Sequence, residues 1–296
     1  MKRYDLVFVG HITFDDIEAR EGSSQRVPGG APLFGAFAAA ASGKRIAVIT
    51  RMVREDAHIL RPLEAAGVDV YLQPSAETTY MRVVHPTANL DERLMYQIKN
   101  AGFFVIEEMP PLEPCLIHLG ALTDREFTLE FMQALRARGF RLSVDMQNFV
   151  RQVDTATGVI HLRDVPAKRE IISLVDTVKL DIVEAEVLTG TSDPKEAAAI
   201  VEGWGAAETL ITRSEGALVR GQGQTYFEPY VNKSAEGRTG RGDTTTGAYL
   251  AWRIEHGVQE SLQFAVALAS IKMETRGPFR GSLSDVLAVM ARPKSA

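Results

Sequence analysis

The sequence predicts an α/β fold built on a mostly parallel sheet, and two patterns lead to this prediction. Short apolar runs typical of buried strands alternate with helical segments over most of the chain, as crossover connections between parallel strands require. The alternation is interrupted once, by two short strands, Thr79 to His85 and Arg93 to Ile98, that form a hairpin pattern. With 296 residues, of which 45% are hydrophobic, the chain can bury a full core.

Composition and charge exclude several classes of function. The net charge is −5 and the basic residues are scattered, which argues against nucleic acid as the main partner. Cys115 is the only cysteine, so no internal disulfide can form, and this suits a reducing compartment. The apolar run near Met1 is too short for a signal peptide, and no apolar run approaches the roughly 20 residues of a membrane span. We therefore expect a cytoplasmic protein with no membrane partner.

The first predicted strand, Leu6 to Val9, ends at Gly10, and two carboxylates follow it. Ligands of open α/β sheets bind beyond the carboxyl ends of the strands, so Asp15 is well placed to bind the hydroxyls of a sugar or polyol. Paired aspartates such as Asp15 and Asp16 are also common in solvated loops, and the sequence leaves both interpretations open. No Gly-x-Gly-x-x-Gly follows this strand, which excludes a dinucleotide-binding oxidoreductase.

A glycine pair, Gly29-Gly30, opens a helix expected from Leu33 to Ala41. Such a pair can form a simple turn, or it can let a ligand pack directly on the backbone. The alternation continues with a strand, a helix and a strand at Ile46 to Thr50, Glu55 to Ala66 and Val68 to Leu72.

After the hairpin the alternation resumes, and its next strand ends in a polar cluster. The expected elements are strands at Leu116 to Gly120, Arg141 to Asp145, Val175 to Leu180, Glu208 to Thr212 and Thr225 to Pro229, with helices at Asp124 to Arg138 and Val258 to Met273. The cluster contains Asp145, Asn148 and Arg151, at the place where a ligand would lie.

A glycine-rich turn between Gly237 and Leu250 leads into an amphipathic helix. Gly240 and Gly242 let the backbone approach an anion, and the helix end behind them supplies unpaired N–H groups. Asp243 lies in the mouth of this cradle, where a bound phosphate would repel it unless it accepts a proton from an attacking hydroxyl. The alternative is an ordinary turn in which Asp243 caps the helix.

Taken together, these motifs resemble the PfkB or ribokinase-like family of carbohydrate kinases, in family order and at family-like distances. The second family signature usually reads Asp-x-Thr-Gly-Ala-Gly-Asp; this chain keeps Thr239, Gly240, Gly242 and Asp243, but has Gly237 for the first aspartate and Arg241 for the alanine. The resemblance implies one domain over residues 1–296, a three-layer αβα sandwich around a mostly parallel twisted sheet, with a small β-sheet lid from about residues 11–26 and 78–100.

The resemblance also implies an ATP- and Mg²⁺-dependent kinase that phosphorylates a hydroxyl of a small sugar, polyol or nucleoside. Asp243 would be the general base, and the backbone N–H groups of Gly240, Arg241 and Gly242 would stabilise the transferred phosphoryl group. The substrate-binding residues would be Asp15, Gly29, Gly30, Asp145, Asn148 and Arg151. The Val-Asp-x-Gln-x-x-x-Arg stretch from residue 144 to 151 resembles myo-inositol kinases, and on this stretch alone we favour myo-inositol.

For the donor, the resemblance implies a second group of residues. Asp181 and Glu184 match the family's Asn-x-x-Glu, with aspartate for asparagine, and Glu184 would help to hold magnesium through water. Thr212, Ser214 and Gly216 resemble the turn that lines the nucleotide, with Ser214 replacing its middle glycine, and Ala269 would lie against adenine. Whether a monovalent cation is also needed stays open.

Three further expectations are weighed beside this one. In this family the lid often doubles as a dimer interface, so a homodimer through the lid is one expectation. A nucleoside or a sugar phosphate could be the substrate instead, with Arg82 or Arg93 meeting the phosphate. Finally, the departures at Gly237, Arg241, Asp181 and Ser214 are compatible with a ligand-binding protein that keeps the kinase fold but has weak chemistry.

Overall fold

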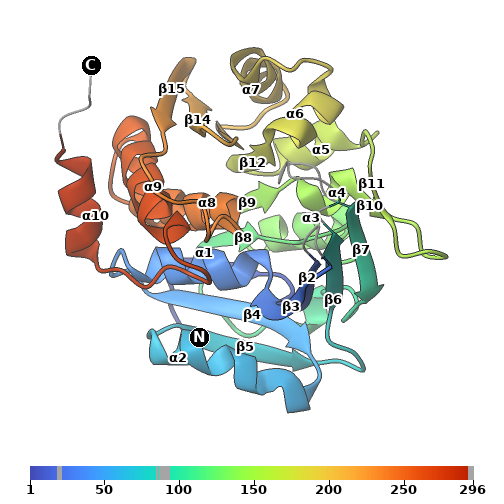
Figure 1. The fold of residues 1–296 in the computed structure, drawn as a ribbon. Coiled ribbons are helices and arrows are strands. Elements are labelled where there is room, and N and C mark those ends of the chain that lie inside the picture. Colours follow the sequence, from blue (N-terminus) through green and yellow to red (C-terminus); the bar gives the residue numbers. More distant parts are fainter. Residues whose placement is uncertain (19–21, 85, 87–93, 293–296) are drawn as a thin grey trace.

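The computed structural model describes residues 1–18, 22–84, 86 and 94–292, and a large central sheet dominates it (Figure 1). Within these residues the sheet has nine strands in the order β15-β14-β13-β12-β9-β8-β1-β4-β5. The pairings from β13 to β5 are parallel, whereas β14 and β15 are antiparallel additions at one edge. The strands are β1 (Leu6–Val9), β4 (Ile46–Met52), β5 (Asp69–Pro74), β8 (Leu116–Leu119), β9 (Arg141–Asp145), β12 (Thr177–Asp181), β13 (Glu208–Thr212), β14 (Gly216–Gly221) and β15 (Gln224–Pro229).

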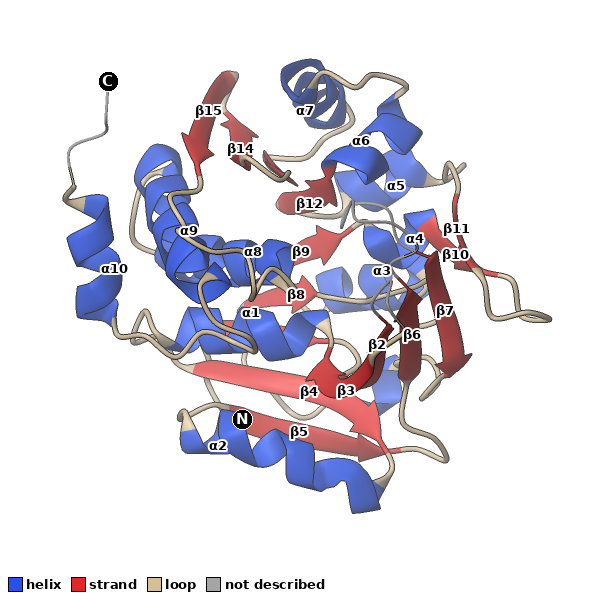
Figure 2. Cartoon of the chain, viewed as in Figure 1, coloured by secondary structure: helices blue, strands red, loops and turns tan. Residues whose placement is uncertain are grey.

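Helices cover both faces of this sheet, which confirms the three-layer αβα sandwich (Figure 2). Strand β1 shows why two layers are needed: Leu6 and Phe8 pack into one core, Val7 and Val9 into the other, and all four are buried. One layer contains α1 (Ala31–Ala40), α2 (Arg61–Ala65), α8 (Arg241–Trp252), α9 (Val258–Met273) and α10 (Leu283–Met290). The other contains α3 (Leu129–Ala137), α5 (Lys168–Ser173), α6 (Ile182–Thr189) and α7 (Pro194–Gly203).

A second sheet, which we call the lid sheet, stands beside the carboxyl ends of the parallel strands (Figure 1). Its four described strands have the order β3-β2-β6-β7. They are β2 (Thr13–Glu18), β3 (Ser24–Gly29), β6 (Tyr80–Val84) and β7 (Leu94–Lys99), which agrees with the smaller sheet expected from two separate stretches of chain. Residues 19–21, 85 and 87–93 of the expected lid, Arg93 among them, lie outside the described residues.

Two helices differ from the sequence prediction for local reasons. The helix expected from Asp124 begins only at Leu129, where Thr128 caps it by accepting a hydrogen bond from the Phe131 N–H. The helix expected over 55–66 is a 3₁₀ helix, Arg54–Leu60, followed by the short α2, which has a proline in its first turn.

Several short elements were not expected from the sequence. These are β3, β14, α5, α7 and α10, the hairpin β10 (Arg151–Val153) and β11 (Ile160–Leu162), the single turn α4 (Gln147–Val150) and the 3₁₀ helix Ile106–Glu108. Strand β3, for example, is mostly exposed and polar, so its sequence carries no alternation signal. Among the described helices, none has the length and apolar character needed to cross a membrane.

Candidate active site

The glycine-rich turn forms the amino-terminal end of α8. Gly240 is the residue before the helix and has φ 75°, and a Cβ atom there would overlap the Phe34 ring. The N–H groups of Gly242 and Asp243 donate to no other group in the described part of the chain, as expected for the first turn of a helix. They are the donors that this turn offers to an anion. The Arg241 N–H donates to the Arg238 carbonyl at 3.0 Å, so its predicted role as a phosphate donor is not supported.

Asp243 lies in the first turn of α8 among four other charged groups. Its carboxylate raises the pKa of Asp15 and of Asp145 by like-charge repulsion, and it favours the charged forms of Lys179 and Lys272. The structure therefore brings together Asp243 and Asp15, which are 228 positions apart in the sequence.

Asp15, on β2, is held against the glycine pair. Thr13 Oγ1 donates to Asp15 Oδ1 at 2.6 Å, and a Cβ atom on Gly29 would overlap the Asp15 carboxylate. Gly30 has φ 100° and its Cα faces the His11 carbonyl, so it shapes the turn beneath. Burial, reinforced by the charge of Asp243, raises the pKa of Asp15 to about 6, although the Thr13 hydroxyl opposes this.

A buried charged network lies beside this pair, at the carboxyl ends of β9 and β12. Lys179 Nζ lies 2.7 Å from Asp145 Oδ2, and Arg151 Nη2 lies 2.8 Å from Glu184 Oε1. Asp181 caps α6, and its side chain and that of Glu184 each accept a hydrogen bond from the other's N–H at 2.8 Å. The network thus joins the predicted substrate-binding and cofactor-binding residues into one cluster.

Pairing decides which of these groups stay charged. Burial disfavours the charge on Glu184, but Arg151 and Lys179 outweigh burial and hold its pKa below the usual range. For Asp145 the order is reversed, because burial and the neighbouring carboxylates outweigh Lys179 and raise its pKa. Asp145 and Arg151 are only 1% and 8% exposed and are held by Lys179 and Glu184, and their direct contact with substrate stays a prediction.

The predicted magnesium contact through Glu184 is also not supported. Glu184 is fully buried, with one oxygen bound by Arg151 and the other by the Asp181 N–H. Among the described residues, no group of three His, Cys, Asp or Glu side chains is placed to hold a metal ion. Mg²⁺ commonly binds through the phosphates of a substrate and keeps several waters, so it needs no dedicated set of protein ligands.

The structure places the other residues predicted to bind the phosphate donor in three different surroundings. Thr212 ends β13, and its Oγ1 would lie 3.4 Å from a Cβ atom on Gly242, so it borders the turn. Ser214 is exposed in the β13–β14 connection, which ends at Gly216. Ala269 is fully buried inside its layer, so it cannot contact adenine as predicted.

Asn148 likewise has a structural role in place of the predicted substrate contact. Its Oδ1 accepts from the Phe127 N–H at 3.2 Å, and its Nδ2 donates to the Phe127 carbonyl at 3.3 Å. Both ends of the amide are thereby used by the backbone, and the side chain is fully buried.

Two buried lysines of the candidate site, Lys179 and Lys272, were missed by the sequence prediction. Lys179 lies within an otherwise apolar strand, and Lys272 lies near the end of a largely apolar helix. A lysine among the apolar residues of a buried strand or helix could have indicated both, because a buried ammonium needs a partner.

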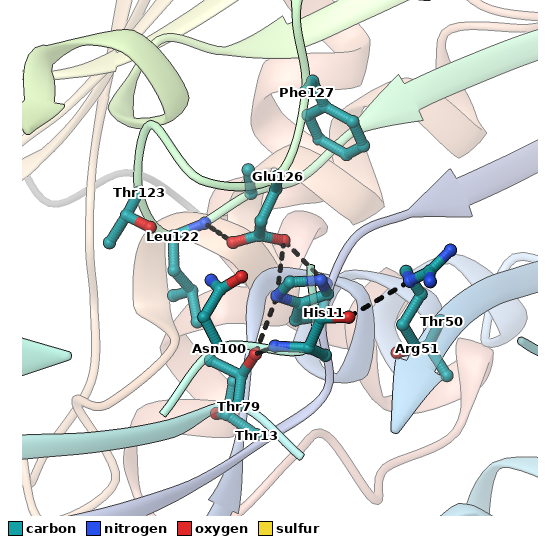
Figure 3. A network of polar contacts seen from close by, with 12 residues as sticks. His11, Thr13, Thr50, Arg51, Thr79, Asn100, Leu122, Thr123, Glu126 and Phe127 are labelled. Atoms are coloured by element: carbon teal, nitrogen blue, oxygen red, sulfur yellow. Dashed lines mark hydrogen bonds and ion pairs between the residues drawn. The ribbon is translucent and has the colours of Figure 1, made fainter. Parts of the chain in front are cut away.

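A polar network at the root of the lid sheet was missed as well (Figure 3). His11 Nε2 donates to the Gly102 carbonyl at 3.0 Å, so Nδ1 accepts from the Thr79 hydroxyl at 2.8 Å. The Glu126 carboxylate accepts from the His11 N–H at 2.8 Å and from the Leu122 N–H at 2.7 Å. This network joins the segments next to β2, β6 and β7 to the loop after β8.

Burial sets the protonation state of this network. It lowers the pKa of His11 to about 3, so the ring is neutral, and it raises the pKa of Glu126 to about 8 against the N–H groups that favour its ionised form. The lid sheet is thus attached to the body through the fully buried side chains of His11, Thr79 and Glu126.

Known proteins resemble this chain over most of its length. The profile of the family described as "pfkB family carbohydrate kinase" matches residues 2–284. A cytidine kinase of Thermococcus kodakarensis is 30% identical over 256 residues, which is 83% of this chain and 87% of the relative. A solved sulfate complex of a pyrophosphate-dependent kinase in the ribokinase family has 32% identity and a TM-score of 0.88, covering 96% of this chain and 99% of that one. A pyrophosphate-dependent kinase of that family, complexed with a pyrophosphate analog and myo-inositol, has 31% identity and a TM-score of 0.87 over 96% and 99%.

Proposed function

Because this chain belongs to the pfkB family of carbohydrate kinases, we propose that it transfers a phosphoryl group from pyrophosphate to a hydroxyl of a cyclic polyol of the myo-inositol type. The observation that carries the reaction is the placement of Asp243, with its carboxylate beside Asp15 and its N–H among the open donors of the α8 turn. This arrangement puts a proton acceptor and an anion-binding site at one point.

In the proposed reaction, Asp15 accepts hydrogen bonds from the acceptor and orients it. Asp243 removes the proton of the attacking hydroxyl while the oxygen of that hydroxyl forms a bond to the terminal phosphorus. The bridging P–O bond breaks, and its electron pair leaves with phosphate. The Gly242 and Asp243 N–H groups meet the charge on the transferred group, since phosphoryl transfer depends mainly on positioning and charge neutralisation.

Arg241 favours pyrophosphate over the ATP that the family resemblance implied. Pyrophosphate has no base or sugar, so its affinity must come from charge and hydrogen bonds. Arg241 brings a guanidinium into the turn where the family usually has alanine, and Tyr230 supports it, with 5.5 Å between Cζ and the ring centroid. Arg213 and Arg241 both lie near the Glu215 side chain, so a second guanidinium is close to the turn. The buried Ala269 removes one contact that adenine was expected to make. The pyrophosphate-dependent relatives support the same choice.

The acceptor rests on Asp15 and on the similarity to the kinase complexed with myo-inositol. A nucleoside is the second candidate, favoured by the cytidine kinase that is 30% identical. A binding protein with weak chemistry is the third, but it leaves Asp243 without a task.

The test is phosphorylation of an acceptor panel with each donor in turn. The acceptors are myo-inositol, ribose, fructose, fructose phosphates and cytidine, and the donors are pyrophosphate and ATP, each with Mg²⁺. Phosphorylated acceptor, detected by ³¹P NMR, is expected with pyrophosphate and myo-inositol. Product formed only with ATP would refute pyrophosphate as the donor, and product formed only with cytidine would refute a polyol of the myo-inositol type as the acceptor. No product in any combination, with pyrophosphate binding shown by calorimetry, would favour the binding protein.

A further inference from the structure

A buried ammonium lies directly beneath the glycine-rich turn. Lys272 is 1% exposed in the last turn of α9. Its Nζ donates to the carbonyl oxygens of Gly237 and Thr239, and it lies 4.9 Å from the centroid of the Phe34 ring. An ammonium has three N–H donors, and two carbonyls and one aromatic face account for all three. Lys272 is therefore partnered entirely within the protein, and its partners are all close to the proposed phosphate site.

The two carbonyls belong to the segment that leads into the phosphate site. Thr239 directly precedes Gly240, the residue before α8, and Gly237 lies two positions earlier. Two carbonyl dipoles that converge on one point repel each other unless a cation lies between them. Converging backbone carbonyls are also how proteins bind K⁺. The Lys272 ammonium carries the same single charge and lies where such an ion would be held.

Gly237 provides an independent observation. A Cβ atom at this position would overlap the Thr275 carbonyl and lie 2.8 Å from the Lys272 carbonyl, and the Gly237 N–H donates to Met273 at 2.9 Å. No side chain fits between the turn and the end of α9, so the aspartate usual in the family signature is excluded here. The aspartate of the family signature is thus absent from the segment whose carbonyls the Lys272 ammonium binds.

We infer that Lys272 is a positioning residue that acts as a tethered monovalent cation, holding the turn before α8 and making the enzyme independent of added K⁺. The activity part of this inference rests on the proposed kinase function. The charged groups that face the ammonium are Asp243 and Arg241, both on α8.

The first test uses the wild-type protein and needs no variant. Turnover is measured in 100 mM KCl and in 100 mM tetramethylammonium chloride, whose cation is too large to enter a carbonyl site. Equal turnover, within about twofold, is expected. A rise of tenfold or more in KCl would overturn the inference.

The second test removes the ammonium. Lys272→Ala empties the space between the carbonyls, whereas Lys272→Met keeps most of the side-chain volume without the charge. In tetramethylammonium chloride both variants are expected to lose at least tenfold in turnover, and KCl or NH₄Cl restores several-fold in Lys272→Ala only. Lys168→Met is the matched control, because Lys168 Nζ also donates to a backbone carbonyl, that of Leu188 at 2.6 Å, on the opposite helical layer. It is expected to keep wild-type turnover in both salts.

A third measurement separates this inference from the proposed function. The thermal midpoint of Lys272→Ala is expected to rise in KCl relative to tetramethylammonium chloride, whereas the midpoint of the wild type is equal in both. This readout needs no substrate, so a protein that phosphorylates nothing in the panel can still support the inference. Equal midpoints and equal turnover of Lys272→Ala in the two salts would overturn it.

Discussion

Gly240→Ala is expected to reduce both stability and turnover, and Gly190→Ala provides a control with nearly the same backbone geometry. The two glycines have φ of 75° and 77°, so alanine incurs the same left-handed strain, about 1 kcal/mol, at either position. At Gly190, the end of α6, an added Cβ meets nothing within 4 Å. At Gly240 it would overlap Phe34, and forcing an atom into a packed region costs a further 1–3 kcal/mol, roughly.

The expected loss of unfolding free energy is therefore about 1 kcal/mol for Gly190→Ala and roughly 2–4 kcal/mol for Gly240→Ala. Urea denaturation measures both. Turnover should separate them further, because moving the turn away from Phe34 displaces the Gly242 and Asp243 N–H groups, and losing one such donor typically costs on the order of 10²-fold. Gly190→Ala should keep wild-type turnover. Equal losses of stability and of turnover in the two variants would refute the placement of the turn against Phe34.

Three further predictions concern charged side chains. Asp15→Asn should raise the KM for the acceptor about tenfold or more. The KM of the wild type should also rise below about pH 6, because Asp15 is then protonated, and the KM of the variant should not change over that pH range. Because the pKa of Asp15 is raised in the folded protein, the wild type should lose stability as the pH rises from about 4 to 6 and Asp15 ionises. The thermal midpoint of Asp15→Asn should not show this loss. Arg151→Met leaves a buried carboxylate without its cation and should cost about 3–5 kcal/mol in urea denaturation. Arg82→Met, whose partner Glu18 is on the surface, should cost much less, and similar costs for the two variants would contradict the buried network. Burial lowers the pKa of Lys272 to about 8, so turnover should fall above pH 8 as the ammonium loses its proton. The stability of the fold should not fall over the same range, because the unfolded chain holds that proton more strongly than the folded protein. A flat rate profile to pH 9.5 would contradict this prediction.

The layers of the fold and the place of the site could be predicted from the sequence because both depend on local patterns. Apolar runs alternating with helices specify a parallel sheet with two covered faces, and a glycine-rich turn before a helix predicts a candidate anion site. Asp243, Asp15 and Gly29 lie together as expected, since each follows a strand or precedes a helix at the same edge of the sheet.

The partners within the site could not be predicted, because they depend on which strands become neighbours. Lys179 meets Asp145 only because β12 pairs with β9, and the alternation of strands and helices does not give the strand order. The same limitation applies to Glu184, whose oxygens are taken by Arg151 and by the cap of α6 and not by a metal. A homodimer through the lid and a cytoplasmic location stay predictions.

The most direct test of the proposed reaction is the rate of phosphorylated product formation by Asp243→Asn. Asp193→Asn is the matched control, since Asp193 also lies at a helix start but caps the surface helix α7 through the Lys195 N–H. A general base contributes about 10²–10⁴-fold, so Asp243→Asn should lose that much turnover while pyrophosphate binding and the thermal midpoint stay near the wild type, and Asp193→Asn should keep full turnover. Turnover by Asp243→Asn within tenfold of the wild type would contradict the assignment of Asp243 as the base.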